Sequence, residues 1–418
     1  MTLPTRARTL SVVFLAVFLW SDPFSITVAQ SALALSAACY GWALWQENGW
    51  RRVQLPLIVP FLLFATITVA SVFVSVDRGR SVLGLKSLLL VVAFYLAANV
   101  VTSESTARVL LAGFLASAAV SSLVGLSASY THGISYRVHS TLSIYMTLAG
   151  ILAVALLLAA ACCIALPGKE RRVATILAVP IAMALLLTYT RNAWLGFVIG
   201  LALLVVALGR RWAIGLVGVA IAAVLVGAVV VPPLAVRVKS MADLSDPTFV
   251  ERVQMWRTGV LMIRDHPWLG VGVKMPEARF REYRVPDFTR ERIAHMHSDV
   301  VQITAERGFL GLGAWLLIWI AFFTRLFGLR ARAKTATAPL TEAVWAWSGA
   351  AVVAVLVGGL FQYNFGDSEI IMIVYFAMGL PFGLVTARAA EASREAGPVR
   401  VATGPSLRHE SIKGAPAR

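Results

Sequence analysis

The chain has 418 residues, of which 59% are hydrophobic and only 14% are charged, and its mean hydropathy is +0.78. A soluble domain of this size is excluded by that composition. Since a bilayer requires roughly 20 apolar residues for each helical span, the repeated apolar runs indicate a polytopic membrane protein. The runs lack the period-two alternation of a transmembrane β-barrel, so the predicted fold class is all-α.

The formal net charge of +16 raises the question of a nucleic-acid partner. The basic residues are spread over loops without interleaved base-stacking aromatic residues, so we expect no nucleic acid to bind. Membrane orientation, contacts with membrane lipids and anionic lipid-linked ligands account for the charge better. The three cysteines, Cys39, Cys162 and Cys163, lie in apolar runs, which argues against a disulfide framework or a thiolate metal site.

About twelve spans are predicted. Residues 9–20 also fit a signal peptide, but the apolar character resumes after Ser21-Asp22-Pro23 and favours two spans joined by a tight turn up to Trp45. The later spans are expected at 55–75, 81–101, 107–128, 141–165, 173–189, 193–208, 212–232, 309–327, 342–361 and 369–387. The chain thus divides into nine spans within 1–232, a long polar segment at 233–308, three spans within 309–388, and a basic tail at 389–418 that we expect to be disordered.

The short basic loops give the orientation. With twelve spans, the loops near residues 51, 108, 170, 210 and 330 fall on one side together with both termini. The positive-inside rule makes that side cytoplasmic. The segment 233–308 then lies outside, and its arginines require another explanation, of which a polyanionic ligand is the simplest.

The long segment contains an expected amphipathic helix. Phe249, Val253, Trp256 and Val260 fall on one helical face, and the helix ends at Asp265-His266-Pro267. Gly270 and Gly272 permit a tight turn or a close backbone approach. We expect this helix to lie on the outer membrane surface or to cover a cavity.

Polar residues that carry chemistry collect between Trp256 and Gly308. His297 begins a short predicted helix that Gly308 breaks, and at a membrane boundary its neutral ring can accept a proton from a hydroxyl. The alternative is a surface histidine hydrogen-bonded to Asp299 or Glu306. The pair His295 and His297 with Asp299 also raises a metal site, but zinc requires three or four converging ligands that the spacing does not supply.

Arg191 follows a span and precedes the next, where a guanidinium is costly unless it meets an anion. Its fork matches phosphate oxygens, so it is a candidate for binding a diphosphate, and snorkelling to the interface is the alternative. Other candidates for substrate contacts share a position at the outer boundary of a span or loop. They are Arg137, Lys86, His295, Trp194, Trp268 and Asp367, with Trp194 and Trp268 equally typical of an interfacial belt.

Three motifs together resemble the O-antigen ligase and polymerase superfamily. They are TRNAWLG after one span, W-R followed by I-R-D-H-P-W-L-G-V-G in the long segment, and H-x-H-S-x-x-x-Q before the next span. Ligases of that superfamily carry Arg-x3-Leu and His-x10-Gly, matched here by Arg191 with Leu195 and His297 with Gly308. Ser298 stands where many relatives have Asn.

The resemblance implies a GT-C-like enzyme of the bacterial inner membrane with a large helical periplasmic loop. It would transfer O-antigen polysaccharide from undecaprenyl diphosphate to a sugar hydroxyl of lipid A-core, with inversion and without a metal or other cofactor. The catalytic residues expected on this basis are His297, Arg191 and Arg264, the histidine as base and the arginines at the leaving diphosphate.

Two alternatives remain. An O-antigen polymerase would use the same donor and a lipid-linked glycan as acceptor. A transporter or flippase for lipid-linked glycans would place charges inside the spans, whereas here the spans are nearly free of charge.

Overall fold

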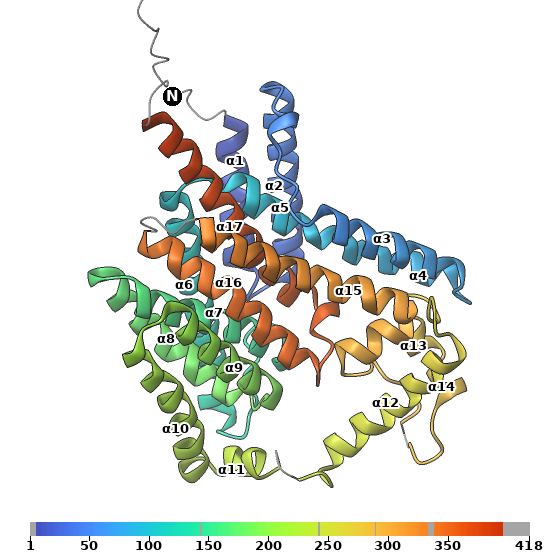
Figure 1. Ribbon diagram of the computed structural model, residues 1–418. Helices are drawn as coiled ribbons and strands as arrows, with labels where there is room; N and C mark the ends of the chain where they lie inside the picture. Colours follow the sequence, from blue (N-terminus) through green and yellow to red (C-terminus); the bar gives the residue numbers. More distant parts are fainter. Residues whose placement is uncertain (1–5, 143, 241–242, 289, 333–337, 396–418) are drawn as a thin grey trace, which may run out of the picture.

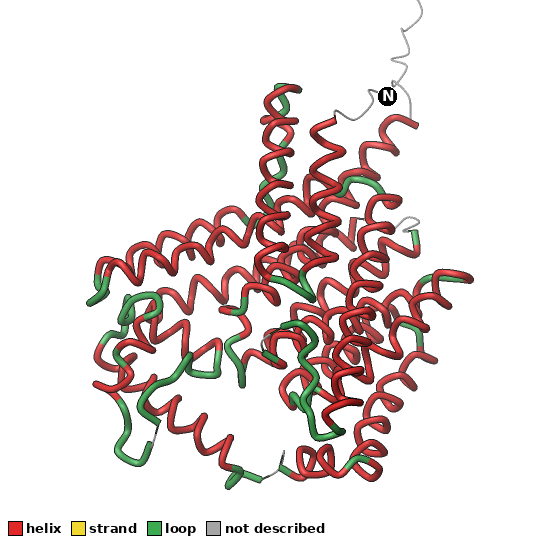
Figure 2. The backbone as a smooth tube through the Cα atoms, turned by 180° about the vertical axis from the view of Figure 1, so that it is seen from behind, coloured by secondary structure: helices red, strands yellow, loops and turns green. Residues whose placement is uncertain are grey.

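The computed structural model describes residues 6–142, 144–240, 243–288, 290–332 and 338–395, and every regular element within these ranges is a helix (Figures 1 and 2). The predicted all-α class is therefore confirmed. The longer helices are α1 (Arg6–Ser21), α2 (Ile26–Gln46), α3 (Ile58–Phe73), α5 (Val92–Val100), α6 (Glu104–His132), α7 (Tyr145–Ala165), α8 (Gly168–Leu187), α9 (Arg191–Leu208), α10 (Ile214–Val230), α12 (Pro247–Asp265), α15 (Asp299–Arg332), α16 (Pro339–Gly359) and α17 (Ser368–Glu395). Shorter helices are α4 (Arg78–Gly84), α11 (Pro232–Lys239), α13 (Met275–Ala278) and α14 (Phe280–Tyr283), with 3-10 turns at Trp50–Arg52, Leu85–Val91, Arg211–Ala213 and Asn364–Gly366.

Within the described ranges, seven helices are long and apolar enough to cross a membrane, or eight if the bent pair α10 and α11 forms one span. The other predicted spans coincide with α1, α2, α3 and α8, which are shorter or less apolar. The chain is thus an all-α polytopic membrane protein. Each of the about twelve predicted spans coincides with a helical segment, and seven or eight of these are long and apolar enough to cross a membrane. The 119° bend follows Val231, where two prolines interrupt the helix.

The centre of the bundle is formed by α7, α16 and α17, the most deeply buried of these spans. Trp347 of α16 is fully buried, and its indole Nε1 donates a hydrogen bond to the Val154 carbonyl of α7 at 3.0 Å. Helix α9 packs on α16 so closely that a Cβ at Gly196 would overlap the Ala354 carbonyl oxygen. Small residues at such crossings let helix backbones approach in a membrane, and this contact anchors α9, which begins at the functional site.

Loops that the basic pattern assigned to one side contact one another. Arg8 pairs with Glu47 at 2.7 Å, Arg108 pairs with Glu170, and the Arg330 guanidinium donates to a carbonyl at the end of α9. The start of the chain and the ends of α2 and α17 lie at the top of Figure 1, and α11 and α12 lie at the bottom. The arrangement groups the basic loops away from the segment that carries the site.

Two expectations require correction. The buried face of α12 consists of Met255, Thr258, Gly259 and Met262, whereas Val260 of the expected face is 56% exposed. The helix turns its small and flexible residues inward because it packs against α15, where a Cβ at Gly259 would overlap Val301.

The expected tail at 389–418 also begins differently. Helix α17 continues to Glu395, because the sequence after residue 385 is rich in Ala, Glu and Arg, which are strong helix formers. The remainder of the expected tail, from 396, lies outside the described residues.

Candidate active site

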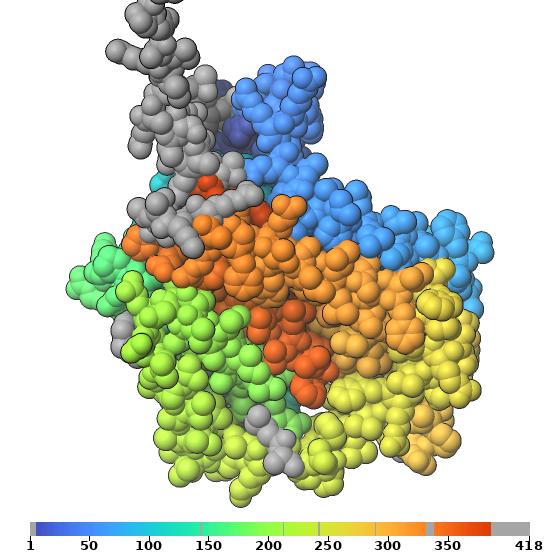
Figure 3. Space-filling view, viewed as in Figure 1, coloured from blue at the N-terminus to red at the C-terminus, as the bar shows by residue number. Residues whose placement is uncertain are grey.

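A cavity of about 280 Å³ lies between the N-terminus of α9 and α12. Figure 3 shows the corresponding hollow between α9, in green, and α12, in yellow. We call it the arginine cavity because five guanidinium-bearing residues from separate parts of the chain line it together with one histidine. These residues are Arg137, Arg191, Arg237, Arg252, Arg290 and His297.

Arg191 begins α9 and ties it to the segment between α11 and α12. Its Nη1 donates to the backbone oxygen and the hydroxyl of Ser240, at 2.8 and 2.7 Å. Its Nη2 donates to the Thr248 hydroxyl at 2.8 Å and lies 3.4 Å from the Asp246 carboxylate. Asp246 also caps α12 through the backbone N–H groups of Thr248 and Phe249. Arg191 therefore shapes the cavity as well as lining it.

The other arginines of the cavity have fewer polar partners than Arg191. Arg137 lies over the Tyr145 ring, 4.5 Å from its centroid, and Arg290 pairs with Glu251. Among the described residues, Arg237 and Arg252 have no carboxylate within ion-pair distance. Burial and the neighbouring Arg191 lower the pKa of Arg252, which is the expected consequence of concentrated positive charge. The cavity is thus suited to a polyanion.

His297 presents a neutral imidazole to this cavity. Its Nδ1 lies 2.6 Å from the Gln362 side-chain oxygen, which can only accept, so Nδ1 carries the proton and Nε2 has a free lone pair. Burial lowers the pKa of His297, the bond to Gln362 opposes this, and Arg252 and Arg290 lower the pKa further. A neutral ring with an available nitrogen is what a general base requires.

The backbone around His297 is held in an uncommon conformation. His297 has φ +49°, and its N–H donates to the His295 Nδ1 at 3.2 Å. The two rings lie 4.2 Å apart, and burial followed by the charge of His297 lowers the pKa of His295 to about 3. His295 therefore accepts a hydrogen bond from the backbone of His297 and does not line the arginine cavity.

The two glycine-containing motifs contact each other at Gly308. There the chain has φ +65° and ψ −170°, which interrupts α15 as predicted. A Cβ at Gly308 would overlap the Trp268 carbonyl, and a Cβ at Gly270 would overlap the backbone at Glu306. The N–H of Val271 donates to the Ala305 carbonyl at 2.8 Å, and that of Phe309 donates to the Pro267 carbonyl at 2.7 Å. The predicted close backbone approach is confirmed, and it satisfies carbonyls that the helix break leaves without partners.

The turn that carries Gln362 is held by Asp299. The Asp299 carboxylate accepts the Phe365 N–H at 2.9 Å, and a Cβ at Gly359 would overlap it. Asp299 therefore positions the partner of His297 and is not itself that partner. Asp367, which was expected to contact substrate, accepts a hydrogen bond from Thr147 at 2.5 Å and does not line the arginine cavity.

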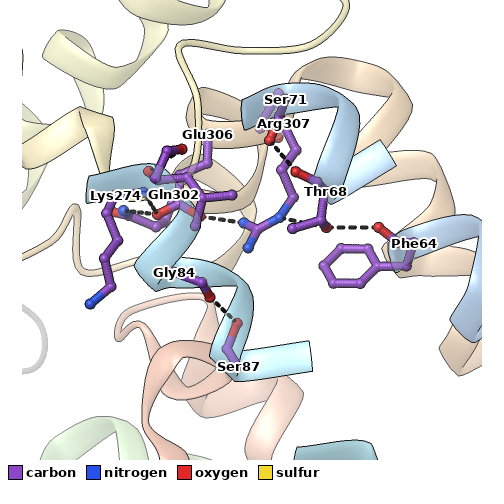
Figure 4. A network of polar contacts seen from close by, with 12 residues as sticks. Phe64, Thr68, Ser71, Gly84, Ser87, Lys274, Gln302, Glu306 and Arg307 are labelled. Carbon is purple, nitrogen blue, oxygen red and sulfur yellow. Dashed lines mark hydrogen bonds and ion pairs between the residues drawn. The ribbon is translucent and has the colours of Figure 1, made fainter. Parts of the chain in front are cut away.

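Behind the histidine segment lies a buried polar network (Figure 4). Arg307 and Glu306 form an ion pair with exposed fractions of 2% each, and Arg307 Nε donates to the Thr68 hydroxyl at 3.1 Å. Gln302 Nε2 donates to Glu306 at 3.0 Å, and the Gln302 side-chain oxygen accepts the N–H of Met296 at 2.8 Å. Through Gln302, the network thus connects the buried ion pair of Glu306 and Arg307 to Met296, the residue before His297.

The structure brings together His297, Arg191 and Arg137 of the expected residues. Arg264 lies elsewhere, on α12 with its side chain 79% exposed and beside Asp265. Trp194 is buried and donates to the Leu185 carbonyl at 2.9 Å, whereas Trp268 is 67% exposed. Lys86 lines a different cavity, described below.

Sequence reasoning missed Arg237, Arg252, Arg290 and Gln362. The excess of arginine in segment 233–308 indicated a polyanion but not which arginines would meet it. Gln362 carried no signal, because it comes from the turn after α16, 65 positions from His297. Among the described residues, no three His, Cys, Asp or Glu side chains converge as metal ligands.

The fold and the cavity define a polytopic membrane protein in which a neutral histidine and several guanidinium groups line one cavity. Residues 176–316 match the model of the O-antigen ligase family. A search of curated proteins gives no significant match. The matched segment contains Arg191, all of α12 and His297. The match supports a glycosyltransferase-like ligase or polymerase, a class that acts on lipid-linked polysaccharides in general.

Proposed function

We propose that this protein is an O-antigen ligase. It transfers O-antigen polysaccharide from undecaprenyl diphosphate to a sugar hydroxyl of lipid A-core at the periplasmic face of the bacterial inner membrane. The observation that carries the proposal is the neutral His297, whose free Nε2 shares one cavity with Arg137, Arg191 and Arg252.

The chemistry follows from these groups. The acceptor hydroxyl oxygen attacks the anomeric carbon of the donor, and its proton passes to His297 Nε2. The bond between the anomeric carbon and the diphosphate oxygen breaks, and the diphosphate leaves with the electron pair. Guanidinium groups neutralise the charge that develops on it, a role for which the fork of arginine suits phosphate oxygens. Attack opposite the leaving group inverts the anomeric centre, and the arginines supply positive charge without a metal.

An apolar groove supports the choice of a lipid-linked donor. It has a volume of about 530 Å³ and runs between α8, α9 and α10, starting at Trp194, one turn after Arg191. Its lining is almost entirely apolar, with Leu201 and Val224 further along. We assign the isoprenoid chain to this groove and the diphosphate to the arginine cavity.

The charge distribution supports the proposed sidedness. The short basic loops group on the side of the N-terminus, which the positive-inside rule assigns to the cytoplasm. The arginine cavity belongs to the opposite group of segments, so we assign it to the periplasm, where the polymer is assembled on its carrier.

The test is transfer by purified protein from undecaprenyl diphosphate-linked glycan to lipid A-core, in the presence of a chelator. We expect wild-type protein to form the product and His297→Ala to lose it while still binding the donor. In cells, loss of a ligase leaves long polymer on the carrier, whereas loss of a polymerase leaves single repeats. Accumulation of single repeats in the His297→Ala strain, or normal transfer by the variant, contradicts the proposal.

A further inference from the structure

A second cavity, of about 600 Å³, lies on the other side of the turn that carries Gln362. We call it the lysine cavity, since Lys86 and Lys274 line it. One part of its wall is apolar and comes from Leu33 and Ala34 of α2 and Leu89 of the 3-10 turn Leu85–Val91. The polar part comes from Lys86, Lys274, Glu277, Glu306, Arg307 and Tyr363.

The cavity opens sideways. Leu89 is 69% exposed, and Lys86 and Ala34 are exposed beside it. Leu89 belongs to a candidate membrane span, Arg78 to Val100. The opening therefore lies on the outer surface of the helical bundle, which we expect to face lipid. A lipid can enter such a cavity from the bilayer with its tails against apolar wall and its headgroup at the polar end.

The charges at the polar end suit a sugar headgroup with an anionic substituent. Arg307 is already paired with Glu306, which leaves two ammonium groups and the Glu277 carboxyl. In Figure 4 the Lys274 side chain extends away from Glu306, and the contact between the two residues is the Lys274 backbone N–H, which donates to the Glu306 carboxylate at 3.1 Å. Glu277 Oε2 is buried and has no hydrogen-bond partner among the described residues, and a buried carboxyl oxygen normally has one. A sugar hydroxyl would supply it.

The lysine cavity adjoins the catalytic histidine. Tyr363 lines it, and the preceding residue, Gln362, binds His297, which lines the arginine cavity. The His295 ring lies 4.2 Å from the His297 ring and 5.8 Å from the Tyr363 ring. Only a layer of side chains therefore separates the two cavities, and the reacting groups of two ligands can meet at His297.

We propose that the lysine cavity binds the acceptor lipid, with its acyl chains between α2 and Leu85–Val91 and its phosphate or carboxylate substituents at Lys86 and Lys274. This inference rests on the proposed function. It assigns the acceptor here and not the donor, because the diphosphate of the donor carries the higher charge density and the arginine cavity carries more cations. Two substrates that react at one histidine then approach it from opposite sides of the Gln362 turn.

The test separates the Michaelis constants of the two substrates, each measured with the other at saturation. Ala34→Trp fills the apolar part, and Leu35→Trp is its matched control, because Leu35 is exposed on the same helix and does not line the cavity. Lys86→Glu reverses one charge, and Lys86→Arg should restore binding. We expect Lys86→Glu to raise KM for lipid A-core about tenfold, the equivalent of one lost charged hydrogen bond. Ala34→Trp should also raise this KM, because the indole occupies the space of the acyl chains. The donor KM and the Leu35→Trp variant should stay at wild-type values.

The unchanged donor KM also shows that each variant is folded. A rise in the donor KM instead would mean that the cavity belongs to the donor, and no change in either KM would mean that it holds bulk lipid; both overturn the inference. A photoreactive residue at position 34 tests binding without turnover. We expect it to capture lipid A-core added alone, with competition by unlabelled lipid A-core and not by phosphatidylglycerol vesicles. Capture at position 34, together with a wild-type protein that transfers no glycan, would refute the proposed function while supporting the site.

Discussion

His297 Nδ1 and the Gln362 side-chain oxygen lie 2.6 Å apart, although the two residues are 65 positions apart in the chain. The contact determines which ring nitrogen is protonated and so directs a free Nε2 lone pair away from Gln362. Helix α16 ends directly before the turn that carries Gln362, and Asp299 holds that turn through the Phe365 N–H. The tautomer of the histidine therefore depends on how α15 and α16 pack.

Gln362→Leu should remove this control and leave the cavity otherwise intact. We expect kcat to fall about 10- to 100-fold, a part of the roughly 10²–10⁴-fold that a general base contributes, with little change in the KM of either substrate. Gln254→Leu is the control, since the Gln254 side chain lies outside the arginine cavity and donates to the exposed Asp287 carbonyl. Steady-state kinetics of both variants decide the question, and an unchanged kcat in Gln362→Leu would remove Gln362 from the mechanism.

The pH dependence should follow the His297 imidazole. Burial lowers its pKa, against the bond to Gln362, and Arg252 and Arg290 lower it further. The neutral ring is the active form, and it is lost as the pH falls through the pKa, so the acid limb of kcat/KM should lie below the ordinary histidine value of about 6.5.

Gln362→Glu places a carboxylate on Nδ1 and stabilises the charged ring. The pKa of His297 should rise, and the acid limb should move to higher pH. A pH profile of kcat/KM for both proteins measures the shift. If the limb does not move, another group is responsible for it.

Arg252 and Arg264 lie on the same helix and make a matched pair. Arg252→Ala removes an unpaired guanidinium from the arginine cavity, and we expect the donor KM to rise about 10- to 100-fold, the range for a lost charged hydrogen bond. Arg264→Ala removes an exposed guanidinium outside the cavity and should leave the donor KM within about twofold of wild type, as surface changes do. Equal losses in the two variants would contradict this assignment of the diphosphate.

The same pair shows where sequence reasoning reached its limit. Helical periodicity predicted α12 and its end before Pro267, and the glycine pattern predicted the close approach at Gly270. Arg264 and Arg252 are twelve residues apart, which on a helix is roughly 18 Å along the axis and about a third of a turn around it. The sequence motif predicted Arg264 as a site residue. In the structure the packing of α12 on α15 turns Arg252 toward the cavity instead. Local periodicity does not predict how one helix packs on another.

The histidine itself was accessible from the sequence, because His297 stands at a polar boundary before a helix that Gly308 breaks. Its partner was not, since Gln362 belongs to a separate helical turn and glutamine is common in loops. The lysine cavity was equally hidden. Lys86 and Lys274 are 188 positions apart. They reach one wall because the segment before α13 packs against α4, where the Ser81 hydroxyl donates to the Val273 carbonyl at 2.9 Å.

Gly308→Ala tests whether the contact between the two motifs stabilises the site. The φ and ψ of Gly308, +65° and −170°, belong to a region that is essentially restricted to glycine. A Cβ there would overlap the Trp268 carbonyl. We expect the free energy of unfolding to fall by about 1–3 kcal/mol and kcat to fall as well, because residues 299–307 carry the polar network that holds Met296 beside His297. Gly313→Ala is the control, since a Cβ at Gly313 meets nothing within 4 Å and alanine favours the helix. Thermal unfolding in detergent, read beside the transfer rate, separates the two; a Gly308→Ala protein as stable and active as Gly313→Ala would mean that the break in α15 is not required for the position of His297.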